Sequence, residues 1–240
     1  MTPHTLARLA LACAALLAAP AFADGLSANV ALATKYKYRG QDQSDPTKDA
    51  VPAIQGGFDY ALGGFYVGNW NSSVSFANAL SGRTIGTEMD LYGGYKGKVS
   101  VLDYDVGLLQ YYYPGSGGSL FNTTELYGQL GWLFITAKYS LTVSDRYFGW
   151  SDARNTGYLD VSANYEIAKG LTLNGHVGQT LFASGAKSAG AANYTDYKLG
   201  ATYDFGGGLT LAGAFVGADK KNVYGDINKG RVIVTLGKSL

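Results

Sequence analysis

The chain alternates apolar and polar residues over about a dozen short segments. In residues 135–144, the clearest case, the odd-numbered positions are Ile, Ala, Tyr, Leu and Val, and the even-numbered positions are Thr, Lys, Ser, Thr and Ser. Successive side chains of a strand point to opposite faces, so this spacing predicts a β-strand with one apolar and one polar face. In a soluble sandwich the apolar face lies in a core. In an outer-membrane barrel it meets lipid, and the polar face lines the interior.

The same reading predicts twelve strands along the chain. The third is expected to turn Tyr66, Trp70, Val74 and Phe76 to the apolar face and the intervening Asn and Ser residues to the polar face. The fifth is the least regular, because apolar residues blur its polar face. The twelve segments are residues 26–39, 53–60, 65–76, 86–96, 103–113, 122–131, 135–144, 156–166, 171–182, 194–204, 209–218 and 231–240.

The connections between these strands alternate in length. Long polar or glycine-rich segments (40–51, 77–85, 114–121, 145–155, 183–193, 219–230) alternate with short ones (61–64, 97–102, near Trp132, 167–170, 205–208). Short turns at one end and longer loops at the other are typical of outer-membrane barrels. Lipid cannot satisfy an open sheet edge, so the first strand should pair with the last. We therefore predict an all-β fold, a transmembrane antiparallel up-and-down β-barrel of about twelve strands.

Aromatic residues collect near the predicted strand ends, where a membrane barrel places them at its two interfaces. The expected group at the long loops is Tyr36, Tyr38, Trp70, Phe76, Tyr112 and Phe182. The expected group at the short turns is Tyr60, Tyr66, Tyr95, Tyr104, Tyr165 and Tyr203. Ordinary enrichment of tyrosine in strands is the competing interpretation.

The first 23 residues have the features of a secretory signal peptide. Arg8 precedes an apolar stretch and the small-residue pattern Ala21-Phe22-Ala23, so cleavage is expected before Asp24, leaving residues 24–240 as the barrel. Cys13 is the single cysteine, and the mature chain would have no disulfide. That mature chain would carry 18 acidic residues and, without Arg8, 18 basic residues. A neutral chain argues against a nucleic-acid partner.

Charged residues on the polar parity are the candidate pore-lining set. A charged side chain facing lipid near the midplane would cost about 2–4 kcal/mol. The set is Lys35, Lys37, Arg39, Glu88, Asp90, Asp105, Glu125, Lys138, Asp160, His176, Asp196, Lys198 and Arg231. Lys35, Lys37, Arg39 and Arg231 should be neighbours at the seam, opposite an acidic wall on the fourth to sixth strands. One hypothesis is a transverse field that filters solutes; the other is a set of salt bridges that neutralise charge and plug the pore.

Enzymatic and metal-binding functions find little support in the sequence. His176 is the only histidine of the predicted mature chain, and no nucleophile pairs with it in a recognisable pattern. No cluster of His, Cys and carboxylate residues has metal-ligand spacing. Asp42, Asp45 and Asp49 fit a solvated acidic loop better than a cation site, and Gly206 to Gly208 read as a turn rather than a phosphate loop. We expect no catalytic residue, no cofactor and no metal.

Several short segments resemble the bacterial TorF family of candidate porins, also described as conserved proteins of unknown function. They lie at residues 29–32, 38–40, 55–60, 64–70, 88–95, 104–107, 112–115 and 124–127. The resemblance implies an outer-membrane location and a transport role, and it supplies no catalytic residues. The chain ends in Leu240, whereas outer-membrane strands commonly end in an aromatic residue.

Together these patterns predict an outer-membrane channel of a Gram-negative bacterium for passive diffusion of small polar or charged solutes. Its partners would be the lipid bilayer, solutes or ions, and the barrel-assembly machinery. The main alternative is a closed barrel with a structural or surface-binding role, in which Tyr147, Phe148 and Trp150 contact a ligand or the membrane interface. A soluble periplasmic β-sandwich is a third interpretation.

Overall fold

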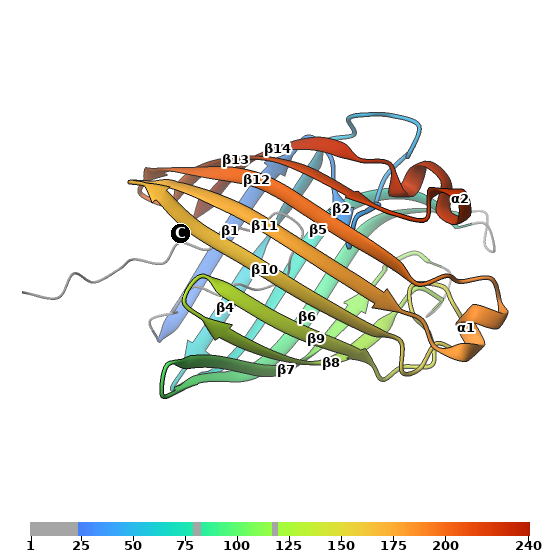
Figure 1. The fold of residues 1–240 in the computed structure, drawn as a ribbon, viewed down its shortest axis with the longest axis horizontal. Helices are drawn as coiled ribbons and strands as arrows, with labels where there is room; N and C mark the ends of the chain where they lie inside the picture. The colour runs from blue at the N-terminus through green and yellow to red at the C-terminus, as the bar shows by residue number, and fades with distance from the viewer. Residues whose placement is uncertain (1–23, 79–82, 117–119) are drawn as a thin grey trace, which may run out of the picture.

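Twelve strands close into an antiparallel barrel in the computed structural model, which describes residues 24–78, 83–116 and 120–240 (Figure 1). Sequence neighbours are neighbours in the wall, and β1 pairs with β14, which closes the barrel. The predicted fold class is therefore confirmed. The wall strands are β1 (Gly25–Ala33), β4 (Ala53–Leu62), β5 (Phe65–Asn78), β6 (Arg83–Val99), β7 (Leu102–Tyr112), β8 (Thr123–Trp132), β9 (Ile135–Thr142), β10 (Gly157–Ala168), β11 (Leu171–Leu181), β12 (Tyr194–Gly206), β13 (Leu209–Ala218) and β14 (Arg231–Ser239).

The two ends of the barrel differ in the length of their connections, as predicted. At one end the strands are joined by two-residue turns at 63–64, 100–101, 133–134, 169–170 and 207–208. The other end carries the segments 34–52, 143–156, 182–193 and 219–230, with the short helices α1 (Ser184–Ser188) and α2 (Lys221–Tyr224) and a 3-10 helix (Gly225–Asn228). Figure 1 shows both α-helices at this long-loop end. The predicted signal peptide lies outside the described residues.

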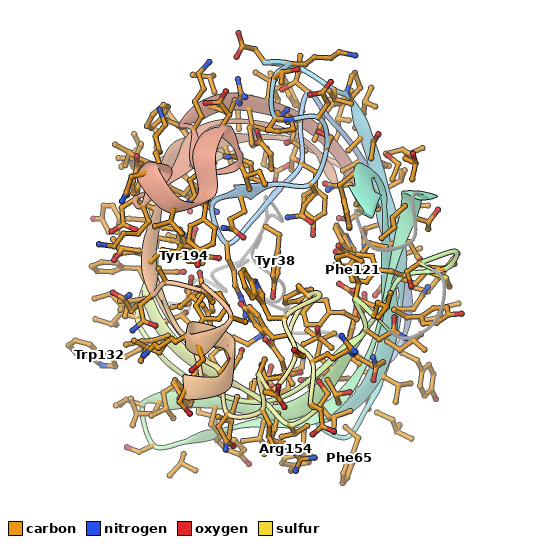
Figure 2. All side chains as sticks on the ribbon, turned by 90° about the vertical axis from the view of Figure 1, so that its right-hand side faces the viewer. Tyr38, Phe65, Phe121, Trp132, Arg154 and Tyr194 are labelled. Atoms are coloured by element: carbon orange, nitrogen blue, oxygen red, sulfur yellow. The ribbon has the colours of Figure 1, made fainter. Side chains whose placement is uncertain are left out.

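The outer surface of the wall is apolar and the inner surface is polar. In β9, Ile135 and Tyr139 are exposed on the outside, whereas Ser140 and Thr142 are buried inside. The same alternation runs through β1, β4 and β14, where Leu26, Phe58 and Val232 point outward. Figure 2, which faces the long-loop end, shows Trp132 and Phe65 pointing away from the barrel. None of the described helices is long and apolar enough to cross a membrane.

The aromatic girdle is present at the short-turn end but not as predicted at the other. Tyr60, Tyr95, Tyr165 and Tyr203 are exposed on the outside, but Tyr66 is buried inside. Of the residues expected at the long-loop interface, only Tyr112 is exposed. The others pack in the interior, and the prediction was wrong for Tyr36, Tyr38, Trp70, Phe76 and Phe182. The half of the barrel nearest the long loops therefore has aromatic side chains in its interior.

Two strands depart from the sequence prediction. β1 ends at Ala33, not at Arg39, because the chain then leaves the wall and enters the lumen. β5 has the opposite face to the one expected: Tyr66, Ser72 and Val74 are buried inside the barrel. A shift of one residue exchanges the faces of a strand, so the asparagines of β5 point outward.

Candidate functional site

A hairpin inside the barrel is the most distinctive feature of the lumen. Its strands, β2 (Lys37–Tyr38) and β3 (Gln41–Asp42), are joined by Arg39 and Gly40. Both tip residues have positive φ, 45° and 75°, which is the geometry of a type I′ turn. A Cβ atom on Gly40 would lie 2.6 Å from both the Cβ of Asp196 and the carbonyl oxygen of Gly217. The hairpin therefore crosses the lumen and its tip contacts the wall at β12 and β13.

Arg39 fixes the hairpin tip to three strands or loops on the far side. Its guanidinium donates to both carboxylate oxygens of Glu125 on β8, at 2.8 and 2.7 Å, and to the Tyr147 hydroxyl at 2.9 Å. It also lies 4.0 Å from the ring centroid of Tyr158 on β10. A bidentate, charge-assisted pair combined with a cation–π contact is a strong, directional anchor. Glu125 is 1% exposed, so the pair is closed to solvent.

Aromatic side chains attach the rest of the hairpin to β5, β6 and β7. The Tyr36 hydroxyl donates to Glu88 at 2.7 Å, and its ring lies 5.6 Å from the ring of Trp70. Tyr38 meets Tyr111 edge to face, with the two hydroxyl oxygens 2.5 Å apart. Tyr38 lies near the middle of the barrel cross-section in Figure 2. The hairpin is thus packed, not merely inserted.

Three basic side chains share one carboxylate at the base of the hairpin. Asp42 lies 2.9 Å from the Nζ of Lys37, 3.5 Å from the Nζ of Lys35 and 3.3 Å from the Nε of Arg231. Lys35 also donates to the backbone carbonyls of Asp45 and Lys48. Burial lowers the pKa of Lys37 to about 8, although the hydrogen bond to Asp42 acts in the opposite direction. Arg231 also pairs with Asp49, so three bases and two acids meet beside β14.

His176 occupies a second ionic cluster, on β10 to β12. Its Nδ1 contacts a carboxylate oxygen of Asp160, and its Nε2 lies 2.7 Å from a carboxylate oxygen of Asp196. The Tyr158 hydroxyl donates to Asp196 at 3.2 Å. Carboxylates only accept hydrogen bonds, so both ring nitrogens donate when both acids are ionised. This makes His176 a cross-strand link in the wall.

Asp90 differs from the other interior acids. It is 0% exposed, and neither of its carboxylate oxygens has a hydrogen-bond partner in the part of the chain that the structure describes. Its cross-strand neighbours are Trp70 and Tyr111. Nearer the short-turn end of the barrel, Asp105 accepts a hydrogen bond from the Tyr66 hydroxyl at 2.5 Å. Asp90 is therefore a fully buried carboxyl group without a hydrogen-bond donor among the described residues.

All thirteen candidate pore-lining residues lie inside the barrel, but their arrangement differs from the one expected. Lys138 and Lys198 are half-buried, and the other eleven are buried. Lys35, Lys37 and Arg39 were expected on the wall of the first strand, and this was wrong because they lie in the inward segment. Arg39 does not stay at the seam but pairs with the acidic wall at Glu125. That these thirteen residues line an open pore remains a prediction.

The long-loop residues Tyr147 and Phe148 belong to the interior rather than to a surface site. Tyr147 is 4% exposed, and Phe148 lies 5.4 Å from Tyr38 and 4.8 Å from Tyr111, centroid to centroid. The expectation of a surface ligand or of membrane anchoring was wrong for these two rings. One sequence feature could have indicated the inward hairpin on which these rings pack. Residues 35–39 alternate bases and tyrosines and are followed by Gly40, a pattern more typical of a hairpin than of a lipid-facing strand end.

Within the described residues, no group of three or more His, Cys, Asp and Glu side chains is placed to hold a metal ion. The sequence placed Asp42, Asp45 and Asp49 in one acidic loop. Asp42 and Asp49 both contact Arg231, and Asp45 accepts hydrogen bonds from Thr47.

Solved porins have a similar fold. The KdgM porin superposes with a TM-score of 0.55 and 9% sequence identity, over 89% of this chain and 97% of that one. The NanC porin gives a TM-score of 0.54 and 13% identity, over 89% of this chain and 98% of that one. At these identities the likeness establishes the fold alone. None of the curated proteins matches the sequence.

One family pattern matches nearly the whole chain. It covers residues 18–239 and is described as "Bacterial protein of unknown function (Gcw_chp)". This description does not carry the TorF name, so the TorF resemblance stays a prediction. The match extends over every wall strand of the barrel. The chain therefore belongs to the Gcw_chp family of bacterial proteins.

Proposed function

We propose that this protein is a porin-like channel of the outer membrane of a Gram-negative bacterium, through which small polar or charged solutes diffuse passively. The carrying observation is the polarity of the closed wall: apolar side chains outside, charged side chains inside. Lipid accepts only structures without open sheet edges, and this barrel has none because β1 pairs with β14. The role is non-enzymatic and needs no cofactor.

Delivery to the membrane would follow the route of other exported barrels. Residues 1–23 act as the signal peptide, and the barrel-assembly machinery inserts the mature chain. Mass spectrometry of the protein from outer membranes should then give a chain beginning at Asp24. A barrel should also migrate faster on a gel before boiling than after it. A soluble periplasmic protein would show neither membrane partitioning nor this shift.

The hairpin makes the narrowest section of the proposed channel. Solutes would pass beside Tyr38 and Arg39 and then along the polar wall that carries Lys138, Asp160 and Lys198. The KdgM porin has been solved in complex with disordered oligogalacturonate, with a TM-score of 0.52 and 9% identity over 89% of this chain and 96% of that one. That complex places an oligogalacturonate on a barrel of similar fold, which is consistent with a polar solute in the lumen proposed here.

Charge replacement in planar bilayers tests the role of the acidic wall. Glu88→Gln is the main variant, because the Tyr36 and Tyr113 hydroxyls donate to this carboxylate and stabilise its charged form. Selectivity in a salt gradient should shift toward anions, whereas Asp90→Asn, at a fully buried carboxyl without a donor, should add little. Glu125 is left unchanged because it holds Arg39. Asp152→Asn, an acid-to-amide change in an exposed loop, is the control. Unchanged selectivity of Glu88→Gln would refute a lumenal field acting on ions.

The second candidate function is a closed barrel with a structural or surface-binding role. The observation in its favour is the Arg39–Glu125 pair, which ties the hairpin across the lumen. Bilayer recordings separate the two candidates. Discrete conductance steps of the purified protein support the channel, whereas a folded, inserted barrel without steps supports the closed form.

A further inference from the structure

The outer face of β5 carries polar side chains where the other strands carry apolar ones. Asn69 lies opposite Phe58 of β4 and Leu91 of β6, which are 59% and 50% exposed on the outside of the barrel. Directly opposed residues of neighbouring strands share a face, so Asn69 also points outward. Asn71 and Ser73 follow it at intervals of two and share this face.

These side chains lie at the middle of the barrel wall. β5 begins at Phe65, next to a two-residue turn, so Asn69 and Asn71 are its fifth and seventh residues. A strand crosses the hydrocarbon in about 9–11 residues. The amides therefore fall near the midplane of the proposed membrane. Gln110 and Gln179, outward amides elsewhere, are the ninth residues of β7 and β11 and lie near the far interface.

Outward amides near the middle of the wall are found on β5 but not on the comparable strands. At the fifth and seventh positions, the four other strands that start from a short turn carry apolar residues, glycine or tyrosine on the outer face. These residues are Val106 and Leu108 of β7, Tyr139 and Leu141 of β9, Gly175 and Val177 of β11, and Gly213 and Phe215 of β13. The polar stripe of Asn69, Asn71 and Ser73 is therefore particular to β5, because the other four strands carry no Asn or Ser on the outer face at the same height in the wall.

Lipid gives an amide no hydrogen-bond partner. The Asn71 amide nitrogen donates to the Gly56 carbonyl at 3.4 Å, and the Ser73 hydroxyl accepts from the Ile54 nitrogen at 3.0 Å. An asparagine has two donor hydrogens and an acceptor oxygen with two lone pairs. One long bond uses a single donor, so the remaining capacity of the two amides calls for a protein partner in the plane of the membrane.

We propose that this stripe is the contact between two copies of the chain, with β5 of each copy facing β5 of the other across a two-fold axis. Asparagine is self-complementary as donor and acceptor, as an isologous contact requires. The stripe lies beside Gly56 and Gly93, which allow close approach. The outward positions 67 to 73 of β5 and 87 to 95 of β6 carry no charge that would select a different, oppositely charged partner. This contact rests on the membrane placement in the proposed function.

Site-directed cross-linking in isolated outer membranes tests the contact. Cysteine is introduced as Asn71→Cys and, as a control at the same height in the wall but four strands away, Phe215→Cys. A short bismaleimide should link Asn71→Cys into a species of twice the chain mass and leave Phe215→Cys unlinked. A linked species containing a different protein, or equal linking of both variants, would overturn the two-copy contact.

A second arm measures association of the purified protein in detergent by native mass spectrometry. The wild type should be dimeric, and Asn69→Leu with Asn71→Leu should dissociate it. Each hydrogen bond between protomers contributes roughly tenfold to the association constant in such surroundings. A monomeric wild type, or a double variant that dimerises equally well, would refute the contact. A chain that does not partition with outer membranes would instead refute the proposed function, so the two failures are distinguishable.

Discussion

The Arg39–Glu125 pair should control whether the hairpin stays docked across the lumen. Removing one member of a buried, hydrogen-bonded ion pair costs about 3–5 kcal/mol, because the other charge is left buried without its partner. Both side chains are buried, and both guanidinium–carboxylate bonds are shorter than 2.9 Å. If this energy is lost from the docked state alone, Arg39→Ala lowers the ratio of docked to released hairpin by a factor of roughly 10²–10³ or more.

Single-channel recording is the assay for this release. Arg39→Ala should give larger conductance steps than the wild type, because the tip no longer crosses the narrowest section. Arg39→Lys is the matched control: it keeps the charge but cannot form the bidentate pair, so its conductance should be intermediate. The hydrogen-exchange rate of the amides of residues 37–42 should rise from the wild type to Arg39→Lys and again to Arg39→Ala.

A double variant guards against simple misfolding. Arg39→Leu with Glu125→Leu removes both charges, so it should unfold less readily than Arg39→Ala while still releasing the tip. The heat-dependent shift on a gel reports that each variant is a folded barrel. If folded Arg39→Ala has the conductance and the amide protection of the wild type, the Arg39–Glu125 pair does not hold the hairpin in place.

Three further predictions concern the tip, the base and the outer wall. Gly40→Ala should increase conductance as Arg39→Ala does. The added Cβ would lie 2.6 Å from wall atoms, and alanine would have to adopt the φ of 75° that Gly40 has. An unchanged conductance would contradict the contact between the hairpin tip and the wall. Because the pKa of Lys37 falls from 10.5 to about 8, its contribution of about 3 kcal/mol to the free energy of unfolding is complete above pH 10.5 and lost as the pH falls through 8. Guanidinium unfolding between pH 7.5 and 10.5 should show this rise in the wild type and not in Lys37→Met. Leu199→Arg, on the outer face, should cost about 2–4 kcal/mol in vesicles, while Lys198→Arg next to it, on the inner face, should cost little.

The wall could be predicted from the sequence because its energetics are local and periodic. The two-residue turns, the faces of β9 and the pairing of the first and last strands each follow from alternation, turn composition and the need to close the sheet. The turns and the faces depend on a few adjacent residues, and the closure follows from the need to leave no open sheet edge. This is why the boundaries of most strands were correct to within a few positions.

The lumenal contents could not be predicted in the same way, because they depend on contacts between distant residues. Arg39 meets Glu125 86 positions away, and Tyr36 meets Glu88 52 positions away. Alternation continues through residues 34–39 as if the strand went on, so periodicity carries no sign that β1 ends at Ala33. The positive φ of Arg39 could not be predicted from the sequence either, because the following glycine is the one residue that favours a turn there.

The two misread strands have one physical cause. Tyr36 of the hairpin packs on Trp70, so β5 must turn Trp70 inward, and the two-residue period then turns Asn69 and Asn71 outward. The hairpin explains why the faces of β5 are exchanged. It does not explain why the outward positions are asparagine, since leucine or valine would satisfy the hairpin equally well and suit lipid better. The amides therefore need a cause outside the barrel, and a second copy of β5 supplies the donors and acceptors that lipid lacks.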